Sequence, residues 1–217
     1  MGRFFVLLIA LPLFLFSSPY DARALTINFD DLSGAPISFA GASALRDRYE
    51  SQGVLFDGPA GPTGNSGGAI LNIATFPITP LSGLNALAFS DLKQASLSDG
   101  GKPVWPETLT FDTLWANVTI YVASTRTDMD HFSLTAYDSG GKPVVIGEAD
   151  AKNDTWGKLS VSWAAGIKSV VLSMDKKGND AFVADNLELT IPVVPEPGTM
   201  LLLGLGVIGL GILRSRT

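Results

Sequence analysis

The chain has 217 residues, of which 46% are hydrophobic, and this is enough for one domain with a buried core. Its formal net charge of -6 argues against nucleic-acid binding, because that requires clusters of basic side chains that replace phosphate counterions. The absence of cysteine excludes disulfides, thiolate metal sites and cysteine nucleophiles.

The N-terminal residues have the order of a secretion signal. Arg3 supplies a positive charge, residues 4–16 form an apolar run, and Ala22 and Ala24 occupy the small-residue positions of a cleavage site. We therefore expect residues 1–24 to be a signal peptide that is cleaved after Ala24. An uncleaved membrane anchor is the alternative, but the apolar run is short for a span of roughly 20 residues.

Residues 25–191 have the pattern of one all-β domain, and we expect an antiparallel β-sandwich or jelly roll. Short segments of strand length are separated by clusters of Gly, Pro, Asp and Asn, which favour turns. Many short strands of this kind are typical of sandwiches and jelly rolls. The expected strands are residues 25–29, 116–124, 132–137, 144–147, 159–163, 167–174 and 183–191.

The remaining segments of the domain predict one helix and one binding loop. A weak helical pattern spans residues 42–52, and the Gly-, Pro- and Asn-rich stretch 58–68 is expected to be an exposed loop. Tryptophan rings can stack on the apolar patches of sugars. Trp105 precedes Pro106 in a loop-like stretch and is the candidate ligand-binding residue, whereas Trp163 lies on an apolar strand phase and is expected in the core.

Two acidic residues continue the apolar phase of the first and last strands. Asp31 follows Ile27 and Phe29 at two-residue spacing, and Asp185 follows Val183 in the same way. A carboxylate on the inward phase of a strand is costly unless a cation or several hydrogen-bond donors meet it.

If the first and last strands are neighbours, side chains with hard oxygen ligands come together at their ends. Ca²⁺ prefers such ligands. The candidate metal ligands are Asp30, Asp31, Asp185 and Asn186. The alternative is a capped strand end, in which Asp31 and Asp185 accept hydrogen bonds from backbone amides or from an arginine such as Arg46 or Arg48.

The C-terminal residues have the order of a membrane anchor. Two prolines around Glu196 cannot continue a strand or helix, because each fixes φ and lacks an N–H donor. Residues 199–213 are uncharged, and at about 1.5 Å per residue they form a marginal membrane helix for a hydrocarbon core of roughly 30 Å. Arg214 and Arg216 follow this run, which predicts a cytoplasmic C-terminus and an exported domain.

This tail resembles the PEP-CTERM sorting signal. The residues that carry the resemblance are Pro195, Glu196, Pro197, Arg214 and Arg216, together with the apolar run between them. It implies that residues 192–217 hold an exported protein at the inner membrane of a Gram-negative bacterium until an exosortase-type protease removes them. The released protein is then expected at the cell surface or in the extracellular polysaccharide matrix. A core helix after a proline turn is the alternative.

The β domain is similar, at both of its ends, to galactose-binding-like and carbohydrate-binding jelly-roll modules. Residues 28–32 and 183–187 carry this resemblance. It implies a structural calcium ion and a non-enzymatic role in which an exopolysaccharide is the ligand.

An exported glycan-active enzyme is the alternative function. A glycosidase requires two carboxylates on either side of a sugar ring. The available glutamates are Glu50, Glu107, Glu148 and Glu188, and the sequence singles out no pair. The Gly64–Gly68 segment matches the GxSxG pattern of serine hydrolases, but it has turn residues on both sides, where a nucleophile elbow needs a strand and a helix. We therefore expect no catalytic residue.

Overall fold

The computed structural model describes residues 23–37, 42, 45–57, 68–75, 78–88, 106–125, 127–175 and 182–191. Several predictions concern residues outside these ranges. They are Ala22 and the rest of the signal run, the loop 58–67, Trp105, the sorting residues Pro195, Glu196, Pro197, Arg214 and Arg216, and the membrane helix 199–213. In the described ranges, no helix is both long enough and apolar enough to cross a membrane.

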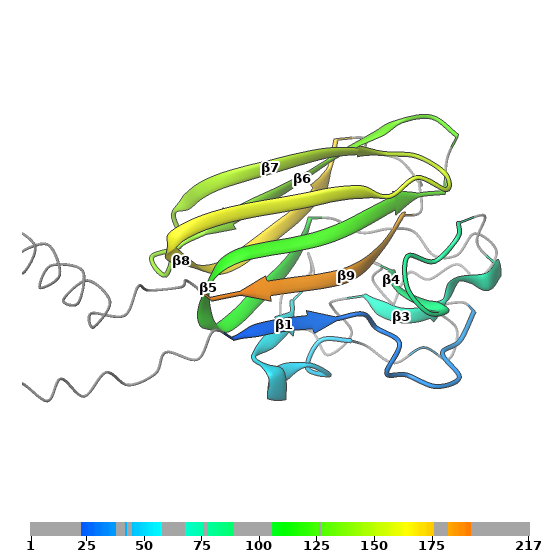
Figure 1. Cartoon of the computed structure of the whole chain (residues 1–217), viewed down its shortest axis with the longest axis horizontal. Helices are drawn as coiled ribbons and strands as arrows, with labels where there is room; N and C mark the ends of the chain where they lie inside the picture. Colours follow the sequence, from blue (N-terminus) through cyan, green and yellow to red (C-terminus); the bar gives the residue numbers. More distant parts are fainter. Residues whose placement is uncertain are drawn as a thin grey trace, which may run out of the picture. The chain divides into compact units, whose positions relative to one another are not determined.

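The described residues form nine strands and two single-turn 3-10 helices (Figure 1). The strands are β1 (Ala24–Ile27), β2 (Val54–Phe56), β3 (Ala69–Asn72), β4 (Asn85–Ala88), β5 (Glu107–Ser124), β6 (Asp130–Tyr137), β7 (Pro143–Ala151), β8 (Gly157–Met174) and β9 (Phe182–Thr190). The helices are η1 (Glu50–Gln52) and η2 (Ile73–Thr75). The helix predicted at 42–52 is therefore reduced to the single turn η1, which ends at Gly53 in the left-handed conformation.

All strands belong to one antiparallel sheet in the order β3-β4-β9-β5-β8-β6-β7, with β1 added beside β9 and β2 beside β5. This confirms the predicted all-β, antiparallel fold. The expected strands 159–163 and 167–174 are one long strand, β8, which is interrupted by an irregularity opposite β5.

The sheet folds over on itself. In a flat sheet β6 and β9 would lie about 14 Å apart, because β5 and β8 separate them and neighbouring strands are about 4.8 Å apart. However, the ring centroids of Phe132 in β6 and Phe182 in β9 are only 5.5 Å apart. The two strands therefore face each other across the core, and β5 and β8 each bend from one layer to the other at the left end of Figure 1.

One large cluster of buried side chains fills the space between the layers. Its members come from all nine strands and from the segments after β1 and before β2, and the largest is Trp115. A smaller cluster covers the other face of β3, β4 and β9. Trp163, which was expected in the core, is 39% exposed, because the irregularity in β8 breaks the alternation that the prediction assumed.

Candidate functional site

The first and last strands are neighbours, as the metal-site prediction requires. β1 pairs with β9 through contacts that run from Ala24 and Thr190 to Ile27 and Leu187. The segment after β1 therefore lies beside the middle of β9, where Asp185 and Asn186 are located.

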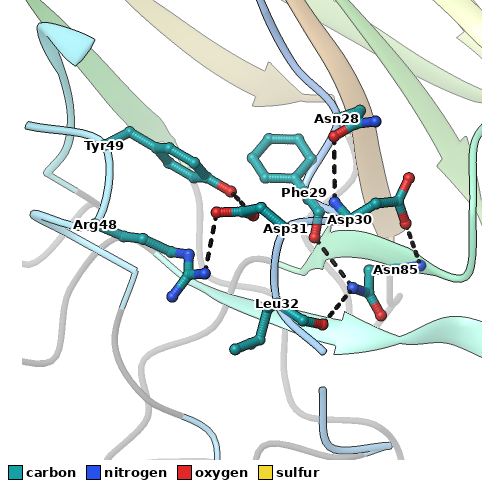
Figure 2. A network of polar contacts seen from close by, with 8 residues as sticks. All are labelled: Asn28, Phe29, Asp30, Asp31, Leu32, Arg48, Tyr49 and Asn85. Atoms are coloured by element: carbon teal, nitrogen blue, oxygen red, sulfur yellow. Dashed lines mark hydrogen bonds and ion pairs between the residues drawn. The ribbon is translucent and has the colours of Figure 1, made fainter. Parts of the chain in front are cut away.

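A left-handed residue follows β1 and places the next carboxylate beside the loop that precedes β4. Phe29 has φ +61° and is fully buried, with its ring edge-on to those of Tyr49 and Phe56. A bulky residue rarely adopts this conformation, so the aromatic packing must stabilise it. The Asn85 side-chain amide donates to the carbonyls of Phe29 and Leu32 at 3.1 and 3.0 Å, which fixes the turn (Figure 2).

A bulge in β9 places Asp185 on the opposite face from the neighbouring leucines. Between Thr119 and Tyr121 of β5 the partner strand contains one additional residue, and Asn186 there has φ +48°. Simple alternation along the strand predicts that Asp185 shares the face of Leu187. Because of the bulge, the two side chains lie on opposite faces. Asp185 is fully buried on the other side of the sheet.

Ser82 joins these side chains from the loop between β3 and β4. Its hydroxyl oxygen lies 3.1 Å from Asp30 Oδ2, 3.3 Å from both carboxylate oxygens of Asp185 and 3.2 Å from Asn186 Oδ1. A serine hydroxyl can donate only one hydrogen. At least three of these four oxygens therefore accept no hydrogen bond from Ser82, although all four lie within 3.3 Å of its hydroxyl oxygen.

Backbone amides of the same loop, of the start of β4 and of β9 donate to the two carboxylates. Asp30 Oδ1 accepts from the amides of Leu84 and Asn85 at 3.1 and 3.2 Å. Asp185 accepts from the amides of Ser82 and Asn186 at 3.0 and 2.7 Å. The loop can close this tightly only because residue 83 is glycine: it has φ +44°, and a Cβ there would lie 2.0 Å from the Asp30 carboxylate.

The electrostatics of the site favour a positive charge. Burial, and to a smaller extent the nearby Asp30 carboxylate, raises the pKa of Asp185 to about 6, although the hydrogen bonds from Ser82 and from the Asn186 amide act in the opposite direction. A raised carboxyl pKa means that its surroundings disfavour the anion. The hydrogen bonds therefore do not fully offset the cost of burying this carboxylate.

Asp31 lies apart from this group. Figure 2 shows its carboxylate directed away from Asp30, toward Arg48 and Tyr49. The Arg48 guanidinium donates to it at 3.0 Å and the Tyr49 hydroxyl at 2.6 Å. Asp31 therefore has the arginine partner that the alternative described, while Asp30, Asp185 and Asn186 come together around Ser82.

The four glutamates considered for a glycosidase lie on separate elements. Glu50 is in η1, Glu107 begins β5, Glu148 is on β7 and Glu188 is on β9. Within the part of the chain that the structure describes, no three His, Asp or Glu side chains gather in a way that could hold a metal ion. The site around Ser82 has only two carboxylates, and its other oxygen ligands are an amide and a hydroxyl.

Sequence reasoning missed Ser82, Gly83 and Asn85. The contact between Ser82 and Asp185 joins residues 103 positions apart in the chain, so no local pattern could predict it. The only local signal is the Ser-Gly pair, which indicates a turn.

Comparison with known proteins identifies the tail and shows likenesses of fold for the β domain. No curated protein matches the chain. The chain is similar to the CBM22-1 xylan-binding domain from Paenibacillus barcinonensis, with 14% identity over 80% of this chain and 97% of that one and a TM-score of 0.43. It is similar to the K2 cleaved adhesin domain of Lys-gingipain, with 13% identity, 77% and 98% coverage and a TM-score of 0.43.

A third solved structure is the family 11 carbohydrate-binding module from Clostridium thermocellum in complex with a β-1,3-1,4-mixed-linked tetrasaccharide. It has 11% identity, 83% and 94% coverage and a TM-score of 0.29. At these identities and TM-scores the likenesses carry no conclusion about this chain. The tail is different, because residues 193–216 match the family model of the PEP-CTERM protein-sorting motif. The chain therefore ends in a PEP-CTERM sorting motif, which implies export and processing by an exosortase.

Proposed function

We propose that this chain is an exported surface protein, released by exosortase processing, whose β domain is a non-catalytic jelly-roll module that holds structural calcium and binds polysaccharide. The observation that carries the proposal is the match of residues 193–216 to the sorting motif. The site around Ser82 supports the calcium part, and the outward face of the sheet supports the choice of ligand.

The sorting part is tested by following the tail in cells. The full chain is expressed in a host that has an exosortase and in the same host without it. With the exosortase, we expect the protein in the medium or on the cell surface with a mass that lacks the tail. Glu196→Ala should keep the protein in the membrane fraction, whereas Pro192→Ala, outside the matched residues, should not. Equal release of both variants, or release without the exosortase, would contradict the proposal.

The oxygen ligands around Ser82 fit a calcium ion. Asp30, Asp185, Asn186 and Ser82 all present oxygen atoms, and Ca²⁺ takes carboxylate, amide and hydroxyl oxygens readily. When bound, calcium would supply the positive charge that two adjacent carboxylates lack. The residues of this chain would hold three separate segments together around it: the turn after β1, the loop before β4 and the bulge of β9.

The outward face of β5, β8 and β9 supports a neutral polysaccharide as the ligand. The Asn117 amide donates to Thr190 Oγ1 at 2.7 Å and accepts from the Ser162 hydroxyl at 2.6 Å. In the next row Thr119 and Ser160 share a hydrogen bond of 2.9 Å. Asn117, Thr190 and Ser162 form a neutral row across three strands, whereas the next row includes Glu188 beside Thr119, and Thr119 is buried. Hydroxyl and amide groups such as those of the first row are suitable partners for sugar hydroxyls.

Binding of neutral polysaccharides to the protein that the exosortase has released tests this face, because the tail and the membrane are then absent. We expect Asn117→Ala with Ser162→Ala to weaken binding at least several-fold. The matched control is Ser133→Ala with Thr135→Ala, which removes hydroxyls from β6 in the other layer. Equal weakening by both pairs, or no binding by the unmodified chain, would contradict the polysaccharide part and leave the sorting part intact.

The two carboxylates around Ser82 do not suit the glycosidase alternative. Asp30 and Asp185 both lie within 3.3 Å of the Ser82 hydroxyl oxygen, and each accepts from backbone amides of the same loop. A glycosidase needs an open space between its two carboxylates for the sugar. In this protein the loop occupies that space.

A further inference from the structure

Both ends of the β domain lie at the same end of the folded sheet. Ala24, at the start of β1, pairs with Thr190 at the end of β9, and Thr190 pairs with Asn117. Asn117 in turn pairs with Ser162 of β8. This row crosses four strands, and it lies at the left end of Figure 1, where β5 and β8 bend between the layers.

Exposed apolar side chains lie directly beside this row. After Ser162, β8 departs from its pairing with β5 until Ile167, and the residues between them form the apolar bulge, defined here as Trp163, Ala164, Ala165 and Gly166. The first three are exposed, and Trp163 is 39% exposed. Leu114 of β5, which is 40% exposed, packs over Gly166, where an added Cβ would lie 2.7 Å from the Leu114 Cβ.

The length of the tail limits how far this bulge can be from a membrane. The described chain ends at Ile191, whose amide donates to the Arg23 carbonyl at the start of the domain. The apolar run of the sorting motif begins at Thr199. Fully extended, the residues between them span at most roughly 28 Å. If the run lies in the membrane, the end of the domain with the apolar bulge is the end held near the lipid surface.

We infer that the apolar bulge, with Leu114, rests in the interface of the lipid bilayer while the sorting tail is still attached. This inference rests on the membrane-anchored state of the proposed function. Tryptophan is favoured at membrane interfaces, because its ring is apolar and its N–H is polar. Two basic residues flank the bulge: Arg23 lies over the Trp115 ring, 5.6 Å from its centroid, and Lys168 follows the bulge in β8. Basic side chains at this end suit an anionic lipid surface, although the whole chain carries a net charge of -6.

The absence of cysteine allows a direct test. Single cysteines are introduced into the full chain as Trp163→Cys, Ala165→Cys and Met129→Cys, and each is labelled with an environment-sensitive fluorophore. Met129 is the matched control, because it is also an exposed apolar residue, at 51%. It lies in the connection between the end of β5 and β6, whereas the bulge lies beside residues 115–117 in the middle of β5. Each protein is reconstituted in vesicles of phosphatidylethanolamine and phosphatidylglycerol, with and without lipids that carry a quencher at the headgroup level.

We expect lipid quenching of the labels at 163 and 165 to be at least two-fold stronger than at 129. If the chain sediments with the vesicles but the three labels are quenched equally, the inference is wrong and the anchor of the proposed function stands. If the chain does not sediment with the vesicles, the anchor itself fails and the inference fails with it. The label at residue 163 could instead become shielded from water as the protein concentration rises, without any lipid. That result would show that a second copy covers the bulge, and it would also overturn the inference.

Discussion

Adjacent aspartates after β1 have different partners, and this difference predicts which of them calcium requires. Asp30 joins the oxygen group around Ser82, whereas Asp31 binds Arg48 at the surface. We expect calcium to raise the melting temperature of the full chain and of Asp31→Asn, but not that of Asp30→Asn or Asp185→Asn. At a concentration 100 times the Kd, a single site adds about 2.7 kcal/mol to the free energy of unfolding.

Thermal unfolding with calcium and with excess chelator measures this effect. Magnesium at the same concentration is the control for ionic strength, because it requires a more regular octahedral site and releases its water reluctantly. A calcium response that survives in Asp185→Asn would show that the ion binds elsewhere. No response in the unmodified chain would remove the calcium part of the proposal.

A second prediction at the residue scale concerns the single histidine. His131 of β6 lies opposite Asp150 of β7, and their side chains approach to 2.7 Å. The hydrogen bond to Asp150 raises the pKa of His131, and the charges of Asp175, Asp150 and Glu148 act in the same direction. The stabilisation by this pair is therefore complete below about pH 6.5, the usual histidine pKa, and is lost as the pH rises through the raised pKa of the folded state.

Proton NMR titration of the imidazole tests this prediction. We expect a pKa above 6.5 in the unmodified chain and a value closer to 6.5 in Asp150→Asn. Asp138→Asn is the control, because the Asp138 side chain binds amides of its own turn and not the histidine. An unchanged pKa in Asp150→Asn would mean that the ring is not held by this carboxylate.

At the scale of the elements, glycines allow β7 and β8 to approach each other closely. A Cβ on Gly147 would lie 2.5 Å from the Ser160 carbonyl oxygen, which belongs to the backbone and cannot rotate away. We therefore expect Gly147→Ala to lower the free energy of unfolding by about 1–3 kcal/mol through overpacking. Gly140→Ala is the matched control, because a Cβ there would meet only the Asp138 side chain, at 3.3 Å, and its effect should be within about 0.5 kcal/mol. Urea unfolding of both variants measures the difference, and equal effects would mean that β7 can move away from β8.

Local sequence signals predicted some of these elements well. The expected strands 132–137 and 144–147 lie within β6 and β7, and the residues between them are a cluster of turn-forming types. Asp138 accepts there from the amides of Gly140 and Lys142 in its own turn. The bulge at Asn186 was not identified, because counting alternate residues assumes an uninterrupted strand and one additional residue moves the side chains to the other face. The same limitation placed Trp163 in the core.

The candidate site was predictable only in part for a similar reason. Asp30, Asp185 and Asn186 could be grouped from sequence, because the only assumption needed was that the first and last strands pair. Ser82 could not be added, because its loop reaches the site through long-range folding. The short strands β3 and β4 on either side of this loop also lack a clear alternating pattern.

At the scale of the whole molecule, the loop that carries Ser82 connects the candidate cation site to the β7–β8 turn. The Trp156 indole donates to the Thr79 carbonyl at 2.9 Å, and Asp154 accepts from the Thr79 amide at 2.9 Å. Hydrogen bonds therefore hold the loop at two places, at Thr79 to the β7–β8 turn and at Ser82 to Asp185. A change at the β7–β8 turn should consequently reach the cation site, although no residue of that turn belongs to it.

Trp156→Phe tests this connection, because it keeps an aromatic ring and removes the indole donor. We expect it to lower the free energy of unfolding by about 1 kcal/mol, the usual contribution of one hydrogen bond, and to weaken calcium binding as the loop becomes less well held. Trp163→Phe is the control, because Trp163 lies at the other end of the sheet and makes no hydrogen bond to this loop in the described structure. Amide hydrogen exchange in residues 79–85 and calcium titration of both variants measure the two effects. Faster exchange in Trp156→Phe with unchanged calcium affinity would show that the ion binds independently of the contacts at Thr79. The β7–β8 turn would then contribute stability but have no influence on the ion.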